Sequence, residues 1–191
     1  VEGGPSKNHD VTKAMMHSDP DAWHTLMRRL VPTIVRFLTT QINAGIDALQ
    51  LFDSWAGFLT ERDYRAHVLP YSTEIFAEVA RVPRIHFGVG TGELLGVMSE
   101  AGSEVMGVDW RVPLDQAAQR MVELQGNLDP AMLFAGRDAI AREVAVIKHQ
   151  ARVAIQEGHA RQHIFNLGHG VLPTTDPGVI TEAVSIIHEE N

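Results

Sequence analysis

Cysteine is absent from the 191 residues of this chain. The absence excludes disulfide bonds, zinc sites built on thiolates and a cysteine nucleophile, and it is compatible with a reducing compartment. Basic residues are few, because 16 Lys and Arg stand against 24 Asp and Glu and give a formal charge of −8. Nucleic acids and anionic membranes require clustered basic side chains, so neither is a predicted partner. No apolar run approaches the roughly 20 residues of a membrane span, and the first residues, VEGGPSKNHD, lack the pattern of a secretion signal.

The sequence does contain a regular alternation of strand-like and helix-like segments. Strands are expected at 46–54, 84–88, 105–109, 121–126 and 162–167. Helices are expected at 10–18, 20–43, 61–81 with an interruption at Pro70, 92–101, 113–120, 135–158 and 177–190. This alternation predicts an α/β fold with parallel strands joined by crossovers. An apolar content of 45% is enough for a sizeable core, and no low-complexity linker divides the chain, so we expect one domain over residues 1–191.

The expected strands all end in small or polar residues. The five segments that follow them are FDSWAG, FGVGTG, VDWRVP, QGNLDP and NLGHGVLP. Five such loops are typical of the ligand-binding rim of a β/α barrel. An open doubly wound sheet would use fewer, mainly at its switch point.

The glycine-rich loop at 88–92 allows a different interpretation. Gly88, Gly90 and Gly92 precede Asp109 at the end of the next strand, as in the cofactor loop of an S-adenosylmethionine-dependent methyltransferase. The dinucleotide-binding pattern is weaker, because Glu93 stands where that pattern has glycine. The simpler interpretation is that the glycines turn a strand into a helix and that Asp109 hydrogen-bonds its own loop. The methyltransferase remains the alternative function.

Six motifs together carry a more specific resemblance. The segments EGGPSK, ALQLFDSWAG, IHFGVGTGELL, GVDWRVPL, LQGNLDP and NLGHGVLPTTDP occur in the order found in the uroporphyrinogen decarboxylase family, from residue 2 to about residue 190. The resemblance implies a partial (β/α)8 TIM barrel that holds strands four to eight and lacks the first three units. Five parallel strands cannot close a ring of eight. The isolated chain is therefore expected to be unstable, dimeric or aggregation-prone.

The resemblance also implies an activity. Members of the family remove carbon dioxide from the four acetate side chains of uroporphyrinogen III and form coproporphyrinogen III, without a metal or an organic cofactor. A cytoplasmic homodimer with facing clefts is implied as well. An arginine motif, an Asp and a Tyr of the family's site are expected upstream of Val1, so we expect the chain alone to be inactive.

Four candidate site residues follow. The resemblance implies that Ser54 and His169 act in catalysis and bind the substrate. The Ser54 hydroxyl would donate to a carboxylate, and His169 lies between two glycines that let a ligand approach the backbone. Phe52, on the same strand face as Ser54, and Arg111 are further substrate-binding candidates. Each residue also has an ordinary structural explanation. Ser54 could hydrogen-bond its own loop backbone, and His169 could be a solvated loop side chain. Phe52 could belong to the barrel core, and Arg111 could form a salt bridge with a neighbouring acid.

The histidines predict no metal site. Related cobamide-dependent methyltransferases place a zinc-binding His-x-Cys at a strand end where this chain has His86, Phe87 and Gly88. Without a thiolate that site cannot form, so His86 is expected to be a partly buried strand residue. The remaining histidines that we considered are expected mostly on helix surfaces and receive no role: His17, His24, His149, His159 and His188.

Overall fold

One parallel sheet organises the chain. The structure is a computed structural model, and it describes residues 1–118 and 123–189. The strands are β1 (Leu49–Asp53), β2 (Arg84–Gly88), β3 (Val105–Gly107), β4 (Glu123–Leu128) and β5 (Gln162–Leu167). They lie in the order β1-β2-β3-β4-β5, and every neighbouring pair is parallel. This arrangement confirms the predicted α/β fold with five strand-helix units of a partial barrel.

Helices connect the strands. The α-helices of the described residues are α1 (Asp10–Ser18), α2 (Pro20–Asn43), α3 (Glu61–His67), α4 (Leu69–Glu78), α5 (Leu95–Ser99), α6 (Leu114–Ala118), α7 (Arg137–Gln156) and α8 (Pro177–His188). Short 3-10 helices occupy Ala56–Phe58, Gly92–Leu94 and Pro130–Phe134. Among the described residues, no helix combines the length and the apolar character that a membrane span requires.

Local signals explain most of the element bounds. Asp19 accepts a hydrogen bond from the Ala22 N–H at 3.1 Å and caps α2, whose first residue is Pro20. The segment expected to be helical at 61–81 forms two helices. The first, α3, ends at His67, and α4 begins at Leu69 with Pro70 in its first turn, where proline is tolerated. The strand expected at 121–126 is found at 123–128, and 121–122 lie outside the described residues.

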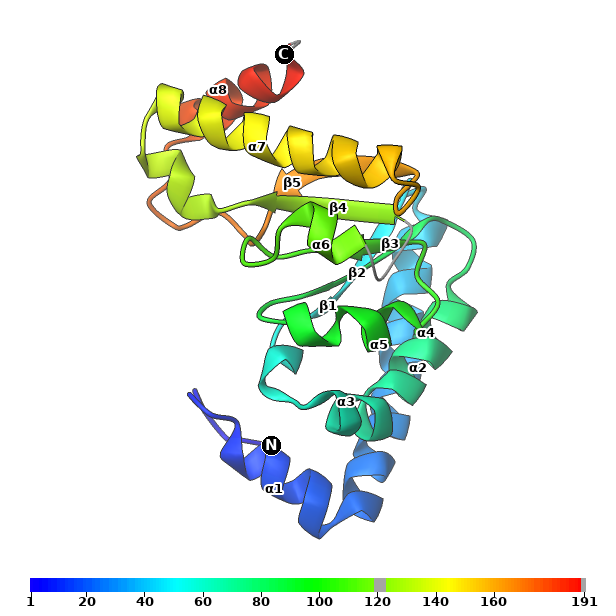
Figure 1. The fold of residues 1–191 in the computed structure, drawn as a ribbon. Coiled ribbons are helices and arrows are strands. Elements are labelled where there is room, and N and C mark those ends of the chain that lie inside the picture. Colours follow the sequence, from blue (N-terminus) through cyan, green and yellow to red (C-terminus); the bar gives the residue numbers. More distant parts are fainter. Residues whose placement is uncertain (119–122, 190–191) are drawn as a thin grey trace.

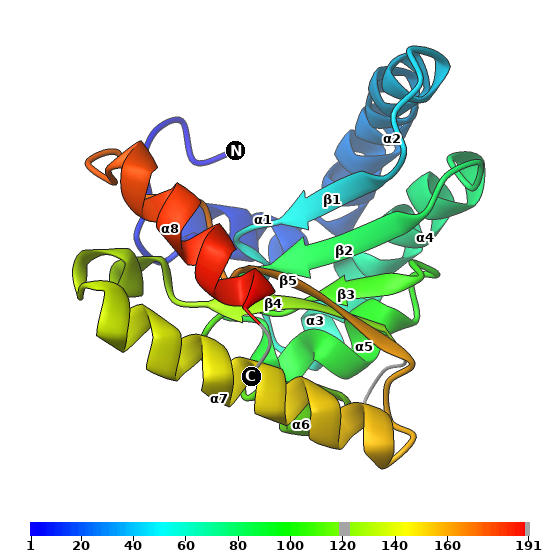
Figure 2. The same ribbon diagram turned by 90° about the horizontal axis from the view of Figure 1, so that it is seen from above.

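Helices cover one side of the sheet. In Figures 1 and 2, α4, α5, α6 and α7 follow one another along this side. One apolar cluster joins α2 and α4 to β1, with Val31, Phe76 and Leu49 among its members. A larger cluster joins β3 and β4 to α5 through α8, and it includes Leu124 and Ile186. The burial of these side chains is the main favourable contribution to folding.

The opposite side of the sheet is open among the described residues. Phe52 in β1 is 62% exposed, and Ile164 in β5 is 44% exposed. Gln125 of β4 donates a hydrogen bond to the side chain of Gln50 of β1 at 2.8 Å. Within the described part of the chain, β1 and β5 each pair along one edge only. This is the geometry of a curved segment of a barrel whose inner face is not enclosed.

Candidate active site

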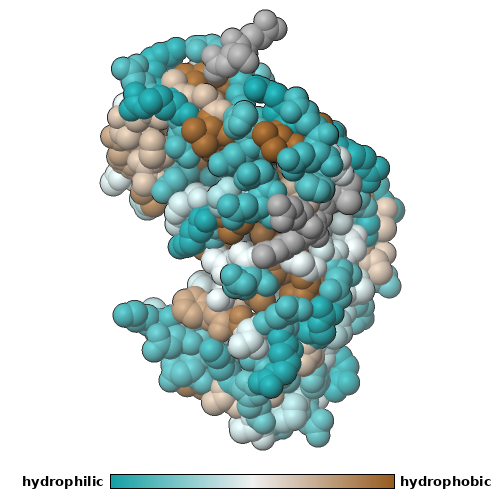
Figure 3. All heavy atoms as spheres, viewed as in Figure 1, coloured by the Kyte–Doolittle hydropathy of each residue, from teal (hydrophilic) through white to brown (hydrophobic). Residues whose placement is uncertain are grey.

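Two adjoining cavities lie at the carboxyl ends of the strands. The smaller has a volume of about 590 Å³ and is lined by residues that follow β1, β2, β3 and β5. The larger has a volume of about 1030 Å³ and lies between the end of β1 and the N-terminal segment. Ser54, Trp55 and Phe58 line both cavities, so we treat the two as one cleft. Figure 3 shows the surface hollowed between the N-terminal segment and the strand-end loops.

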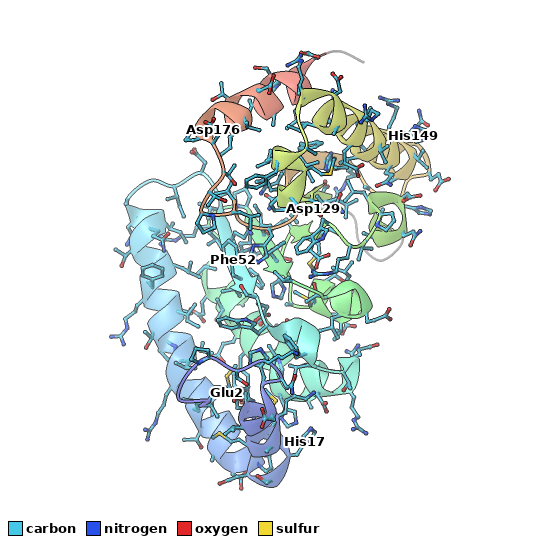
Figure 4. All side chains as sticks on the ribbon, turned by 90° about the vertical axis from the view of Figure 1, so that its left-hand side faces the viewer. Glu2, His17, Phe52, Asp129, His149 and Asp176 are labelled. Atoms are coloured by element: carbon cyan, nitrogen blue, oxygen red, sulfur yellow. The ribbon has the colours of Figure 1, made fainter. Side chains whose placement is uncertain are left out.

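The structure brings the four predicted site residues to this cleft. Ser54, Arg111 and His169 follow three different strands and line the smaller cavity together. Phe52 and Ser54 line the larger cavity. Figure 4 looks into the cleft and shows Phe52 in the middle, with Glu2 of the N-terminal segment below it. The sequence therefore predicted which residues meet, whereas their chemical roles stay predictions.

A buried hydrogen-bond network holds the end of β1 directly before Ser54. The Asp53 Oδ2 atom accepts a hydrogen bond from the Tyr64 hydroxyl at 2.8 Å and lies 2.8 Å from His86 Nε2. A carboxylate only accepts hydrogen bonds, so the Nε2–H of His86 is the second donor. Burial, together with the Asp53 charge, raises the pKa of Tyr64, and its hydroxyl stays protonated. The prediction for His86 was wrong in degree, because its ring is fully buried.

Arg111 is tied to its own loop and still reaches the cleft. Its guanidinium forms an ion pair with Asp109 at 2.7 Å, and its backbone N–H donates to the same carboxylate at 2.9 Å. The guanidinium carbon lies 3.9 Å from the centre of the Trp110 ring. The salt bridge named as the alternative outcome is therefore present. The stacked, half-exposed guanidinium is held in one orientation at the cleft wall.

The glycine-rich loop has a structural explanation. Asp109 is 2% exposed and accepts hydrogen bonds from the Gly90 and Arg111 N–H groups. Gly90 has a φ of 67°, which favours glycine. A Cβ atom on Gly57 would lie 2.5 Å from the Gly90 carbonyl oxygen, so the loops after β1 and β2 touch through their backbones. Since Asp109 is buried and does not line the cleft, the methyltransferase interpretation loses its ribose-binding acid.

His169 is exposed and has a defined tautomer. Its Nδ1 atom accepts a hydrogen bond from the Gly170 N–H at 2.7 Å, so Nε2 carries the proton of the neutral ring. Gly168 does not serve ligand approach as expected, because a Cβ atom there would lie 2.4 Å from the Trp110 nitrogen. Gly170 has open space around it. The first glycine thus lets the loops after β3 and β5 meet, and the second leaves His169 accessible.

Sequence reasoning missed the N-terminal wall of the cleft. His9 and Lys13 line the larger cavity. The Lys13 Nζ atom donates to the Phe58 carbonyl at 3.0 Å, and the His9 ring lies 4.6 Å from that of Phe58. No local pattern announces these contacts, because they join residues more than 40 positions apart. With Arg111, Lys13 brings a second cation to the cleft of an acidic chain.

Comparisons with known proteins agree with the fold and identify a family. The sequence matches the family described as uroporphyrinogen decarboxylase (URO-D) over residues 1–190. It is 73% identical to the uroporphyrinogen decarboxylase of Corynebacterium diphtheriae, with 98% of this chain and 56% of the relative covered. For Rhodococcus jostii the identity is 61%, with 98% and 54% covered. The chain thus spans about half the length of these curated relatives.

A solved structure shows the same fold. A methyltransferase from Methanosarcina mazei has a TM-score of 0.79, with 92% of this chain and 51% of that chain covered. At 14% identity the likeness concerns the fold alone. The match over residues 1–190 and the high identity to curated relatives are far more specific, and this chain belongs to the uroporphyrinogen decarboxylase family.

Proposed function

We propose that this chain forms one wall of the cleft in which a uroporphyrinogen decarboxylase removes carbon dioxide from the four acetate side chains of uroporphyrinogen III, to give coproporphyrinogen III. The observation that carries the proposal is the convergence of Ser54, Arg111 and His169 on one cavity. The match to the family over residues 1–190 supports the reaction class. A cytoplasmic homodimer whose decarboxylation chemistry uses neither a metal nor an organic cofactor belongs to the same proposal.

The reaction needs an electron sink and a proton. An acetate on a pyrrole loses carbon dioxide readily once the ring has been protonated, because the cationic ring accepts the electron pair of the broken bond. The protein must place a proton donor and stabilise charge where water is scarce. The Nε2–H of His169 and the Ser54 hydroxyl are two donors that line the smaller cavity.

The remaining residues fit the shape and charge of the substrate. Phe52 offers an exposed aromatic ring on the wall of the larger cavity, suited to contact with a macrocycle. Arg111 and Lys13 can each approach a carboxylate. Two cations are few for a substrate with eight carboxylates. We therefore expect further basic groups from the part of the barrel that this chain does not match.

The test is a variant of His169 in a completed barrel. The part of the Corynebacterium diphtheriae relative that this chain does not match would precede residues 1–191 in one polypeptide. We predict that His169→Ala lowers kcat/KM for uroporphyrinogen about ten- to a hundredfold, because one charge-assisted hydrogen bond to a carboxylate is worth roughly 1.5 to 3 kcal/mol. Steady-state kinetics measure the effect. If His169 were instead the one proton donor for all four acetates, the loss in kcat/KM would be larger.

The matched control is His159→Ala. His159 is an exposed histidine just before β5, at the opposite end of the strand from His169. This variant should keep the kinetics of the parent, and both variants should melt at the parent temperature. If the His169 variant also keeps them, the ring is a solvated loop side chain and our assignment fails.

A further inference from the structure

A second cluster of polar side chains lies away from the cleft. His17 is in the last turn of α1, and Asp63 and His67 are four residues apart on one face of α3. Each offers one ligand atom, and these atoms lie within 4.8 Å of one another. The His17 Nε2 atom is 3.7 Å from the Asp63 Oδ2 atom. Figure 4 shows His17 at the far end of α1, well away from Phe52.

The Asp63 carboxylate accepts no hydrogen bond from the described residues, although its side chain is largely buried. Its side chain is 8% exposed. Among the described residues, its carboxylate contacts are His17 at 3.7 Å and the exposed Arg62 at 3.8 Å, both beyond hydrogen-bond distance. A buried charge is costly unless it is paired closely or coordinates a metal. The carboxylate is therefore available to a small cation.

The His67 ring has the complementary feature. Its Nδ1 atom is buried and has no hydrogen-bond partner in the described part of the chain. Neutral imidazole with a free nitrogen is the form that binds metals. Within the described residues, His67 Nδ1 has no hydrogen-bond partner, and the Asp63 carboxylate has only ion-pair neighbours at 3.7 and 3.8 Å.

We propose that His17, Asp63 and His67 bind one divalent ion of the zinc class, with water as the remaining ligand. Two nitrogen ligands and one carboxylate suit zinc, whereas calcium and magnesium prefer oxygen ligands. Ligand atoms around a tetrahedral zinc lie roughly 3.4 Å apart. The cluster therefore needs only small side-chain movements to close on an ion, and the half-exposed His17 leaves a path for entry.

Neighbouring groups support His67, one of the two ligands of this site that lie on α3. The His24 ring stacks on that of His67 with centroids 5.5 Å apart. The His24 Nδ1 atom is 2.6 Å from the Tyr71 hydroxyl, and the Trp23 Nε1–H donates to the His67 carbonyl at 2.9 Å. Such contacts around a metal ligand fix its orientation. They explain how a short helix holds His67 in place.

The proposed ion would act beyond the decarboxylation chemistry. The helix that carries His17 also carries Lys13 and Met16, which line the larger cavity. An ion bound by α1 and α3 would fix the N-terminal wall of the cleft. It would do so without contact to the substrate, so the site is structural rather than catalytic.

The test is a titration of chelator-treated, tag-free protein with zinc chloride. We expect isothermal titration calorimetry to show one equivalent bound with a micromolar or tighter Kd. His17→Ala and Asp63→Asn should each weaken binding at least about tenfold. His149→Ala removes an exposed histidine of α7 and should change nothing. Cobalt(II) should give the visible absorption of a four-coordinate ion in the parent and not in His17→Ala.

Two outcomes would overturn the proposal. One is binding of well under one equivalent of zinc, and the other is equal affinity in the parent, His17→Ala and Asp63→Asn. Circular dichroism serves as the folding control, and the same titrations in the completed barrel guard against a folding defect of the 191-residue chain. Zinc should raise the melting temperature of the parent and of His149→Ala but not of His17→Ala. Because zinc binding is read without substrate, failure here leaves the decarboxylase proposal untouched.

Discussion

Two aspartates ten residues apart, Asp53 and Asp63, both lie beside histidine rings, and they are satisfied in opposite ways. Asp53 is the less buried, with a side chain 23% exposed, and it has donors at 2.8 Å from Tyr64 and His86. Asp63 is 8% exposed, and its nearest basic atoms are at 3.7 and 3.8 Å. Burial alone therefore does not reveal the role of a carboxylate. The hydrogen bonds that it accepts distinguish a structural acid from one that can take up a ligand.

The largest change in stability should come from the substitution at Asp53, whose carboxylate accepts two hydrogen bonds. We expect Asp53→Asn to lower the free energy of unfolding by about 2 kcal/mol, because two hydrogen bonds each lose roughly 1 kcal/mol of charge assistance. Urea-induced unfolding followed by circular dichroism measures the change. A loss below about 0.5 kcal/mol would show that the network contributes little to stability.

A third histidine, His163, extends the comparison, because it is partly buried beside a carbonyl group instead of a carboxylate. His163 Nε2 lies 2.6 Å from the Gly126 carbonyl oxygen. Burial lowers the pKa of His163, and this hydrogen bond offsets only part of the shift. As the pH falls, His163 is therefore protonated at a higher pH in the unfolded chain than in the folded chain. The contribution of neutral His163 to the free energy of unfolding is fully present above the unfolded pKa of about 6.5. It is lost as the pH falls through the folded pKa.

His163→Gln should remove this pH dependence. The amide can still donate to the Gly126 carbonyl but does not titrate. Melting temperatures between pH 7.5 and 5, values that bracket the titration of about 6.5, should fall less steeply for the variant than for the parent. His149→Gln, at an exposed position of α7, is the matched control and should follow the parent. Parallel curves for all three proteins would refute the assignment.

The smallest effect is expected at the unsatisfied site. With a chelator present, Asp63→Asn should change the free energy of unfolding by less than about 1 kcal/mol. The favourable position of a negative charge in the first turn of α3 is lost, and the cost of burying a loosely paired charge is relieved. The same urea titration as for Asp53→Asn gives a direct comparison. A loss as large as that of Asp53→Asn would mean that Asp63 has structural partners of equal strength.

The sequence predicted the elements well because their signals are local. Asp19 and Pro20 mark the start of α2, and Pro70 marks the break between α3 and α4. Ser54, Arg111 and His169 could be grouped in advance because the carboxyl ends of parallel strands meet at one rim. The family resemblance singled out Ser54 and His169, and the topology of a parallel sheet explains why their strand ends lie together.

The polar clusters could not be predicted in the same way. The Asp53 network joins β1, β2 and α3, and the zinc candidate joins α1 to α3, so both depend on how helices dock. Only Asp63 and His67, four positions apart on one helix, are close in the sequence, and this spacing alone indicates no metal site. His17 was expected on a helix surface without a role, and its position beside Asp63 is set by the packing of α1.

The strand order has a consequence for how the protein is made. Each strand of the sheet pairs with the strand that follows it in the sequence, from β1 to β5. No strand has to wait for a partner from the distant end of the described sheet, so contacts form between segments that leave the ribosome one after another. Domains can begin to fold from the N-terminal side during synthesis. In this sheet, each new strand could pair at once with the strand translated just before it.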